Sequence, residues 1–244
     1  MILLAVDTSG ESQGIALMEE GRLLAEHREP SVSSHSETLL PNIANLLKQE
    51  GLAPTKIDVF ALTVGPGSFT GLRIGIATIK GLAAAHDRPV VPISTLQALA
   101  EPQLARAGQV FSILDARMNE VFILGLGVRE ASAPTVLLEE SCLSLPDAIR
   151  TISQHPGVKH LLGSGAQKFA EEFGPMEGVE ISTEASCHAV SAAAVARLAQ
   201  VAWKRGEFVP WGNLAARYWR ASEAENRLYG LKTQKSLNLP RSDG

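Results

Sequence analysis

The chain has 244 residues, of which 45% are apolar and 20% charged, so it can form one large or two modest domains with a packed core. Its net charge of −4 argues against a large basic surface, and any nucleic acid would need a partner protein to hold it. The sequence starts at the strand-like run 2–6, with no leader pattern and no membrane-spanning apolar run, which predicts a cytoplasmic protein. Cys142 and Cys187 fit neither a metal pair nor a disulfide framework and are interpreted as small buried side chains.

The first thirty residues predict a three-stranded meander. A buried strand over 2–6 ends in the polar turn Asp7-Thr8-Ser9-Gly10, and strands around 14–18 and 23–27 follow. Asp7 could hold a hydrated metal or orient a nucleotide phosphate, or its carboxylate could close the turn by accepting backbone N–H bonds. The turn role is favoured.

A helix is predicted next, beginning at a capping box with Ser34 as N-cap and Glu37 three residues on. It ends near Gly51, and Pro41 should kink it or mark a one-turn start segment. Its broad apolar face is formed by Leu39, Leu40, Ile43, Leu46 and Leu47.

The sequence centres on Gly65-Pro66-Gly67-Ser68-Phe69-Thr70-Gly71-Leu72-Arg73-Ile74-Gly75, which follows the apolar run 59–64 and opens a segment helical to about residue 85. Such a strand–turn–helix junction can bind anions, because the helix N-terminus offers unpaired N–H groups and glycine lets a phosphate approach the backbone. The stretch matches neither a Walker A loop nor a dinucleotide fingerprint, so its spacing identifies no nucleotide. Gly163-Ser164-Gly165-Ala166, after a strand at 159–162, predicts a second possible phosphate cradle.

The helix after the first cradle is apolar almost all round, which predicts burial by its own domain or by another chain. Gly71 and Gly75 leave a flat strip where another element can approach closely. Both interpretations stay open at this point: a core helix with steric glycines, or a subunit interface.

The second half repeats the beginning of the chain. A strand over 109–114 ends in Asp115-Ala116-Arg117 and a return strand covers 120–128, as at the start of the sequence. This echo suggests an internal duplication of one α/β unit. Strands and helices are also expected over 89–93, 94–105, 146–154, 159–162, 167–173 and 189–204.

The predicted fold class is α/β, with two similar mixed-sheet halves and glycine turns at an interdomain cleft, as in the actin-like ATPase and sugar-kinase class. Residues 1–105 form the first half with the glycine loop and the interface helices. Residues 106–225 form the second half, and 226–244 a partly disordered tail.

Six segments occur in an order that resembles one family. They are Val6-Asp7-Thr8-Ser9, Ser34-His35-Ser36-Glu37-Thr38-Leu39-Leu40-Pro41, the glycine stretch 65–75, Lys80-Gly81-Leu82-Ala83, Asp115-Ala116-Arg117-Met118-Asn119-Glu120 and Tyr218-Trp219-Arg220. Together they resemble the bacterial TsaB (YeaZ) family, over residues 1 to about 220. The glycine stretch is the most specific of them, and the second half matches only loosely apart from the Asp115 segment.

The resemblance implies a non-catalytic subunit of the machinery that makes N6-threonylcarbamoyladenosine beside the anticodon of tRNAs reading codons that begin with A. The catalytic relative TsaD is its expected partner, the ATPase TsaE a further one, and tRNA would be met only through the complex. A homodimer is expected when the partner is absent. No cofactor is expected to be tightly bound, although ATP or ADP could act within the complex, and the family's older description as a glycoprotease is not followed.

The catalytic relative carries a His-xxx-His metal pair after the strand that follows the glycine stretch, and these positions fall on Thr95 and Leu99 here. Leucine has no donor atom and threonine a weak one, so we expect no catalytic metal and no catalytic residue. The sequence also has no HExxH zinc-protease signature.

Two sets of site residues follow. The phosphate or nucleotide set, a hypothesis, contains Asp7, Thr8, Ser9, Gly65, Gly67, Gly163 and Gly165. The partner-interface set resembles the pair of helices through which the family forms a bundle, and contains Leu39, Leu40, Ile43, Leu47, Gly71, Gly75, Ile79 and Leu82.

Two alternatives remain open. One is a small-molecule kinase or ATPase of the same fold, with Asp7 for metal-bound nucleotide and Asp115 as base, although its second glycine turn is short for such kinases. The other is a direct tRNA binder using Arg73, Arg117, Arg217 and Arg220, which the net acidity weakens.

Overall fold

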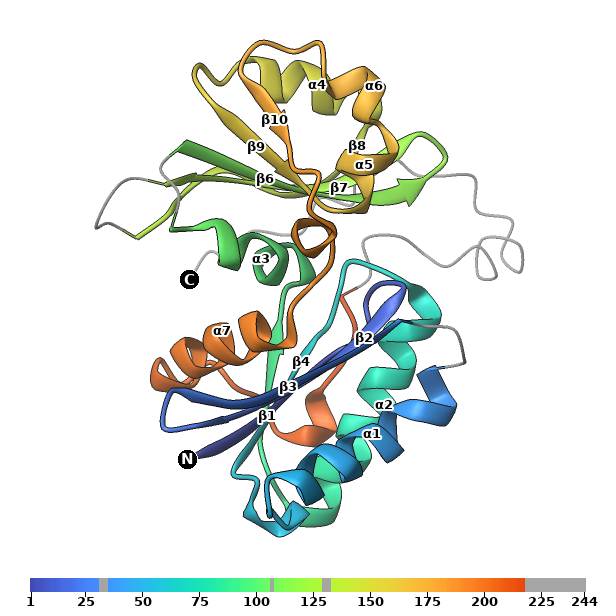
Figure 1. Ribbon diagram of the computed structural model, residues 1–244, viewed down its shortest axis with the longest axis vertical. Coiled ribbons are helices and arrows are strands. Elements are labelled where there is room, and N and C mark those ends of the chain that lie inside the picture. Colours follow the sequence, from blue (N-terminus) through green and yellow to red (C-terminus); the bar gives the residue numbers. More distant parts are fainter. Residues whose placement is uncertain (31–34, 106–107, 129–132, 218–244) are drawn as a thin grey trace, which may run out of the picture.

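The computed structural model of the chain describes residues 1–30, 35–105, 108–128 and 133–217. Two five-stranded sheets of mixed strand direction lie one above the other, with helices outside each sheet and between the two (Figure 1). Within these described ranges, no helix is both long and apolar enough to cross a membrane.

The first sheet begins with the predicted meander. β1 (Ile2–Asp7) pairs antiparallel with β2 (Ser12–Glu19), and β2 pairs antiparallel with β3 (Arg22–Pro30). On its other side β1 pairs in parallel with β4 (Val59–Thr63), which pairs in parallel with β5 (Val90–Ile93). The strand order is therefore β3-β2-β1-β4-β5. Helices cover both faces of this sheet, which is why β1 and β4 are unbroken apolar runs rather than alternating ones.

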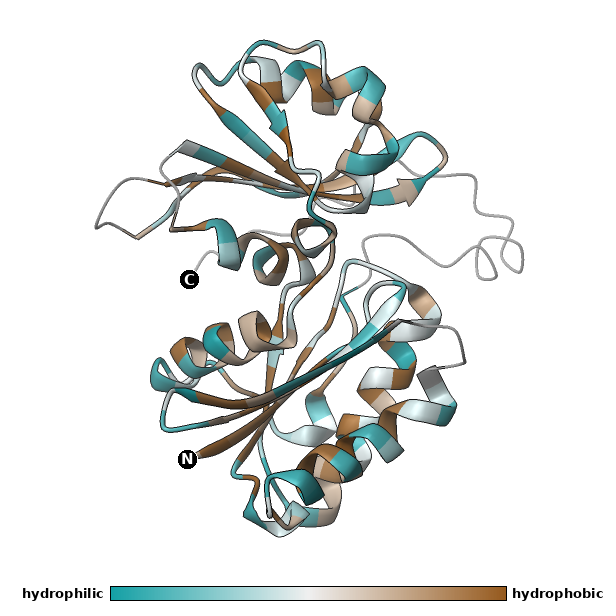
Figure 2. Cartoon of the chain, in the orientation of Figure 1, coloured by the Kyte–Doolittle hydropathy of each residue, from teal (hydrophilic) through white to brown (hydrophobic). Residues whose placement is uncertain are grey.

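Two helices cover the outer face of the first sheet. α1 (His35–Gln49) and α2 (Phe69–His86) pack on the sheet and on each other (Figure 1). α1 is continuous through Pro41, while the predicted N-cap Ser34 lies outside the described residues. η1 (Pro54–Lys56) connects α1 to β4. In Figure 2 the central strands of the first sheet are brown, whereas the outer helices carry both brown and teal. The outer helices are therefore amphipathic, with their apolar sides on the sheet.

The second sheet repeats the first. β6 (Gly108–Arg117) pairs antiparallel with β7 (Glu120–Val128), and β7 with β8 (Thr135–Ser144). β6 also pairs in parallel with β9 (Lys159–Leu162), and β9 with β10 (Val179–Ile181). The order β10-β9-β6-β7-β8 is that of the first sheet with β6 in the place of β1. The predicted duplication of one α/β unit is confirmed, and the architecture is that of the actin-like ATPase and sugar-kinase class.

The outer face of the second sheet is covered by α4 (Leu145–Ser153), α5 (Ser164–Lys168) and α6 (Ala170–Phe173). The helix expected over 167–173 is therefore wrong in its bounds. It is divided at Phe169, whose backbone (φ −108°, ψ 32°) is not helical. The strands β8 and β10 are also absent from the sequence prediction.

The two halves exchange one helix each. α3 (Thr95–Ala100), followed by η2 (Glu101–Gln103), comes from the first half of the chain and packs on β6 and β7 of the second sheet. α7 (Ala192–Lys204), reached through η3 (Ala185–His188), comes from the second half and packs on β1 and β2 of the first sheet. The predicted division at residue 105 therefore does not place α7 with the sheet that it covers.

A single apolar cluster runs through these exchanged helices and joins the two sheets. It contains Leu3 and Ala5 of the first sheet, Val110 and Leu124 of the second, and buried residues of both helices. After α7, η4 (Trp211–Asn213) leads the chain back to the glycine stretch, where the Arg217 N–H donates to the Val64 carbonyl over 2.8 Å.

Candidate functional site

A cluster of hydrogen-bonded polar side chains lies at the end of β1. It contains Asp7, Ser9 and Thr63 and is called the polar knot below. Asp7 is 2% exposed, and its Oδ1 accepts hydrogen bonds from the hydroxyl groups of Thr63 and Ser9, both at 2.6 Å, and from the Ser9 backbone N–H at 3.2 Å. Burial raises the pKa of Asp7 above its ordinary 3.8, although these hydrogen bonds oppose the shift. Asp7 thus closes its own turn, which is the favoured interpretation of the sequence.

The glycine stretch packs directly on this knot. The Ser68 N–H donates to the Ser9 carbonyl over 2.7 Å, and a Cβ atom on Gly67 would lie 2.5 Å from the same oxygen. A Cβ on Gly65 would lie 2.8 Å from the Arg217 carbonyl oxygen. The space that these glycines leave open is therefore filled by the chain's own backbone. Phosphate binding at the first cradle stays a prediction.

The first turns of α2 approach the same knot. A Cβ on Gly71 would lie 2.0 Å from the Thr8 carbonyl oxygen, and a Cβ on Gly75 would lie 2.3 Å from Thr8 Oγ1. The Thr8 hydroxyl donates to the Gly71 carbonyl over 2.8 Å. The flat glycine strip thus faces Thr8, in the turn after β1 of the same chain, and of the two open interpretations the structure supports the core helix with steric glycines.

The second glycine turn is filled in a similar way. A Cβ on Gly163 would lie 2.3 Å from the Ile113 carbonyl oxygen, and one on Gly165 would lie 2.8 Å from the Ile113 side chain. The buried His188 ring holds the turn: its Nδ1 lies 3.1 Å from the Gly163 N–H, and its Nε2 lies 2.7 Å from the Ser182 carbonyl oxygen. Donation from Nε2–H to Ser182 leaves Nδ1 to accept from Gly163. Phosphate binding at the second cradle also stays a prediction.

Asp115, the counterpart of Asp7, has a different environment. Its carboxylate is a quarter exposed and pairs with Lys168 Nζ at 2.8 Å, and its Oδ1 accepts the Arg117 N–H at 2.9 Å. Both oxygens thus already accept a hydrogen bond within the chain, and the role of Asp115 as a base stays a prediction.

Thr95 and Leu99, the two positions where the catalytic relative is expected to carry its metal pair, lie in the apolar interior. Thr95 is 1% exposed and Leu99 is 3% exposed. A Cβ on Gly163 would lie 2.7 Å from a methyl carbon of Leu99, so the leucine side chain packs against the second glycine turn. Within the described part of the chain, no three His, Cys, Asp or Glu side chains form a group that could hold a metal.

The predicted interface set divides into core and surface residues. Six of its eight members are buried in the chain's own core: Leu39, Ile43, Leu47, Gly71, Gly75 and Ile79. Contact of these six with a partner stays a prediction, and in the free chain they pack in its core. Leu40 is 51% exposed and Leu82 is partly exposed, and both line an apolar hollow of about 60 Å³ between α1 and α2.

Comparison with known proteins agrees with the sequence motifs. The family model described as TsaD, tRNA N6-adenosine threonylcarbamoyltransferase, matches residues 29–205. The solved structure of YeaZ from Pseudomonas aeruginosa is 32% identical, with a TM-score of 0.74, over 89% of this chain and 99% of that one. The chain belongs to the TsaB (YeaZ) family. A second solved structure from Pseudomonas aeruginosa, described as similar to peptidase YeaZ, aligns at 31% identity and a TM-score of 0.73, over 90% of this chain and 99% of that one.

Curated relatives carry the name tRNA threonylcarbamoyladenosine biosynthesis protein TsaB. The Haemophilus influenzae protein is 41% identical over 50% of this chain and 52% of its own length, and the Escherichia coli protein is 38% identical over 50% and 53%. This TsaB-family chain thus matches about half of the length of these curated relatives.

Sequence reasoning missed two residues of this region. Thr63 is the one hydroxyl residue in the apolar run 59–64, and a lone hydroxyl at the end of a buried strand was the available signal. His188 could be found only from the fold, because it follows the Gly163 turn by 25 positions.

Proposed function

We propose that this TsaB-family chain is a non-catalytic subunit in the biosynthesis of N6-threonylcarbamoyladenosine in tRNA, and that it acts as the scaffold and activator of a catalytic TsaD-type subunit. The modified base is the adenosine 3′ of the anticodon in tRNAs reading codons that begin with A. The names of the curated TsaB relatives and the match to the TsaD family model support the pathway.

The packing of Leu99 carries the non-catalytic part of the proposal. The side chain lies in the apolar interior against Gly163, at one of the two positions where the catalytic relative is expected to carry a histidine. The other position, Thr95, is equally buried. Imidazole nitrogens are good ligands for iron and zinc, whereas an aliphatic side chain supplies none. The tightly packed glycine turns also favour a chain that does not itself turn over a nucleotide.

The proposed docking surface lies between α1 and α2. The apolar hollow there is lined by Leu40, Leu82, Ala44, Pro54 and deeper core side chains. A partner helix that inserts an apolar side chain would bury Leu40, which is half exposed in the free chain. The same surface would serve a homodimer when the partner is absent, and TsaE and tRNA would join through the complex.

The test mixes the chain with the TsaD-type subunit from the same organism and measures mass by size-exclusion chromatography with light scattering. A homodimer that converts to a 1:1 heterodimer supports the proposal. Leu40→Asp should abolish both species, because it places a charge in an apolar contact. Leu23→Asp is the matched control, since Leu23 is 41% exposed on β3, in a sheet strand away from the hollow.

Activity provides the second measurement. Formation of the modified adenosine by the catalytic subunit should require the chain and should fail with Leu40→Asp but not with Leu23→Asp. A chain that ignores the partner, or modification that proceeds equally without it, would refute the scaffold role. ATP-dependent turnover by the isolated chain would instead favour the kinase or ATPase alternative.

A further inference from the structure

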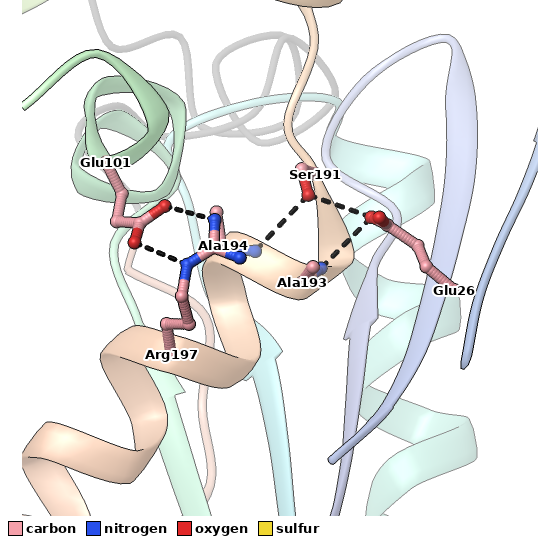
Figure 3. Close-up of polar contacts among 6 residues, drawn as sticks. All are labelled: Glu26, Glu101, Ser191, Ala193, Ala194 and Arg197. Carbon is pink, nitrogen blue, oxygen red and sulfur yellow. Dashed lines mark hydrogen bonds and ion pairs between the residues drawn. The ribbon is translucent and has the colours of Figure 1, made fainter. Parts of the chain in front are cut away.

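The two lobes are connected through polar contacts at the start and in the middle of one exchanged helix, α7. The Arg197 guanidinium of α7 binds the Glu101 carboxylate of η2 in a fork, with Nε–Oε1 at 2.6 Å and Nη2–Oε2 at 2.5 Å (Figure 3). At the start of α7, Glu26 Oε1 of β3 accepts the Ser191 hydroxyl at 2.8 Å and the Ala193 N–H at 3.0 Å. Glu101 continues from α3, which packs on the second sheet, whereas Glu26 lies in the first sheet.

The apolar contact between the exchanged helices does not by itself fix their register. The buried residues of α7 are mostly small: Ala192, Ala193, Ala194, Val195, Ala196 and Ala199. A smooth alanine surface allows close approach but provides few side chains that interlock, and apolar attraction has no direction. A bidentate arginine–carboxylate pair, by contrast, fixes both distance and orientation.

We propose that α7 is a rigid connector, or splint, between the two lobes. Glu26 fixes the start of α7 to the first sheet, and the Glu101–Arg197 fork fixes α7 to the segment that packs on the second sheet. The splint sets the angle between the two sheets, and the chain behaves as one rigid body rather than as a pair of hinged lobes. The continuous apolar cluster holds the lobes together, and the fork selects one arrangement among those that the cluster permits.

The splint accounts for a charge pattern that the proposed function leaves unused. Two glutamates far apart in sequence converge on one short helix, and Arg197 has its pKa raised by the hydrogen bond to Glu101. Neither glutamate lies in the polar knot or beside the hollow between α1 and α2. The inference does not depend on the role in tRNA modification, and it can be tested on the free chain.

The test uses Glu101→Gln and Arg197→Gln in the full chain, with Arg150→Gln as the matched control. Arg150 also binds a carboxylate, that of Asp147 at 2.7 Å, but both residues lie in α4. Hydrogen exchange of the α3 and α7 amides should become about fivefold faster in the first two variants, which corresponds to ~1 kcal/mol. Arg197→Lys keeps the charge without the fork and should fall between them and the wild type.

Interlobe distance provides the decisive measurement. Spin labels at Arg22→Cys and Glu171→Cys, two exposed positions in different lobes, report it in a Cys142→Ser background that leaves the buried Cys187 in place. Dilution with unlabelled protein removes signals between molecules. We expect one narrow distance distribution for the wild type and Arg150→Gln, and a broadened or displaced one for Glu101→Gln and Arg197→Gln. Unchanged distributions in both fork variants, even with faster exchange, would overturn the splint and leave only a local contact.

Discussion

The sharpest prediction compares two glycines of the same helix. Gly71→Ala and Gly81→Ala make the same chemical change in α2, but a Cβ on Gly71 would lie 2.0 Å from the Thr8 carbonyl oxygen, while nothing lies within 4 Å of one on Gly81. In an exposed helix interior, alanine is favoured over glycine by about 1 kcal/mol. Gly81→Ala should therefore stabilise the chain and raise Tm by roughly 2–4 °C.

Gly71→Ala should do the opposite. Real Cβ contacts are essentially never shorter than 3.0 Å, so α2 or the β1–β2 turn must move to accept the new methyl group. The obstacle is a backbone oxygen, which cannot turn aside as the end of a flexible side chain could. Overpacking of this kind costs about 3 kcal/mol, which leaves a net loss of about 2 kcal/mol after the gain in helix propensity. The movement would also disturb the hydrogen bond from the Thr8 hydroxyl to the Gly71 carbonyl.

Gly75→Ala separates a backbone obstacle from a side-chain obstacle. Its Cβ would meet Thr8 Oγ1 at 2.3 Å rather than a backbone atom. Thr8→Ala removes that hydroxyl and should rescue Gly75→Ala, whereas it should not rescue Gly71→Ala. Urea unfolding followed by circular dichroism measures all of these variants as a double-mutant cycle. A Gly71→Ala protein at least as stable as the wild type would refute the close packing of α2 on the knot.

Two further predictions concern buried polar groups. Burial raises the pKa of Asp7 above 3.8, so the wild type loses stability as pH rises from 3.8 through that raised pKa. Asp7→Asn has no such group and should gain stability relative to wild type over this rise in pH, as measured by urea unfolding at a series of pH values. A difference that does not grow with pH would contradict this. His188→Ala should lower the free energy of unfolding by about 2–3 kcal/mol, because it removes a buried ring and the acceptor of the Gly163 N–H. Thermal or urea unfolding measures this change, and unchanged stability would show that the ring does not hold the turn.

The sequence predicted the fold through patterns that the structure confirms. Asp7 and Asp115 each follow a buried strand and precede a returning one, and this echo corresponds to the repeated strand order of the two sheets. β8 escaped prediction because Leu137-Leu138-Glu139-Glu140 does not alternate, and its pairing with β7 is interrupted by register shifts. The periodicity of α7 identified a helix, but periodicity does not say which sheet a helix covers.

The site was harder to predict, since glycine marks where atoms approach closely without saying which atoms they are. The glycine stretch suggested a phosphate cradle, and the structure places the backbone of Ser9 and Thr8 in that space. The same limit applies to the interface set. The apolar pattern of α1 could not separate the buried Leu39 from its exposed neighbour Leu40, because both fall on a broad face whose edge only packing defines.

The two halves place an aspartate and a glycine turn at corresponding points of the two sheets. In the first half, the hydroxyl groups of Thr63 and Ser9 donate to the carboxylate of Asp7, the last residue of β1. In the second half, Lys168 pairs with the carboxylate of Asp115, near the end of β6. Each aspartate is therefore bound by side chains of its own half. The first glycine turn packs on the backbone of Ser9 and Arg217, and the second packs on Ile113 of β6. Both aspartates thus already take part in internal contacts, while Leu40 and Leu82 between α1 and α2 keep exposed apolar surface. This arrangement favours a protein that acts by binding a partner rather than by catalysing a reaction itself.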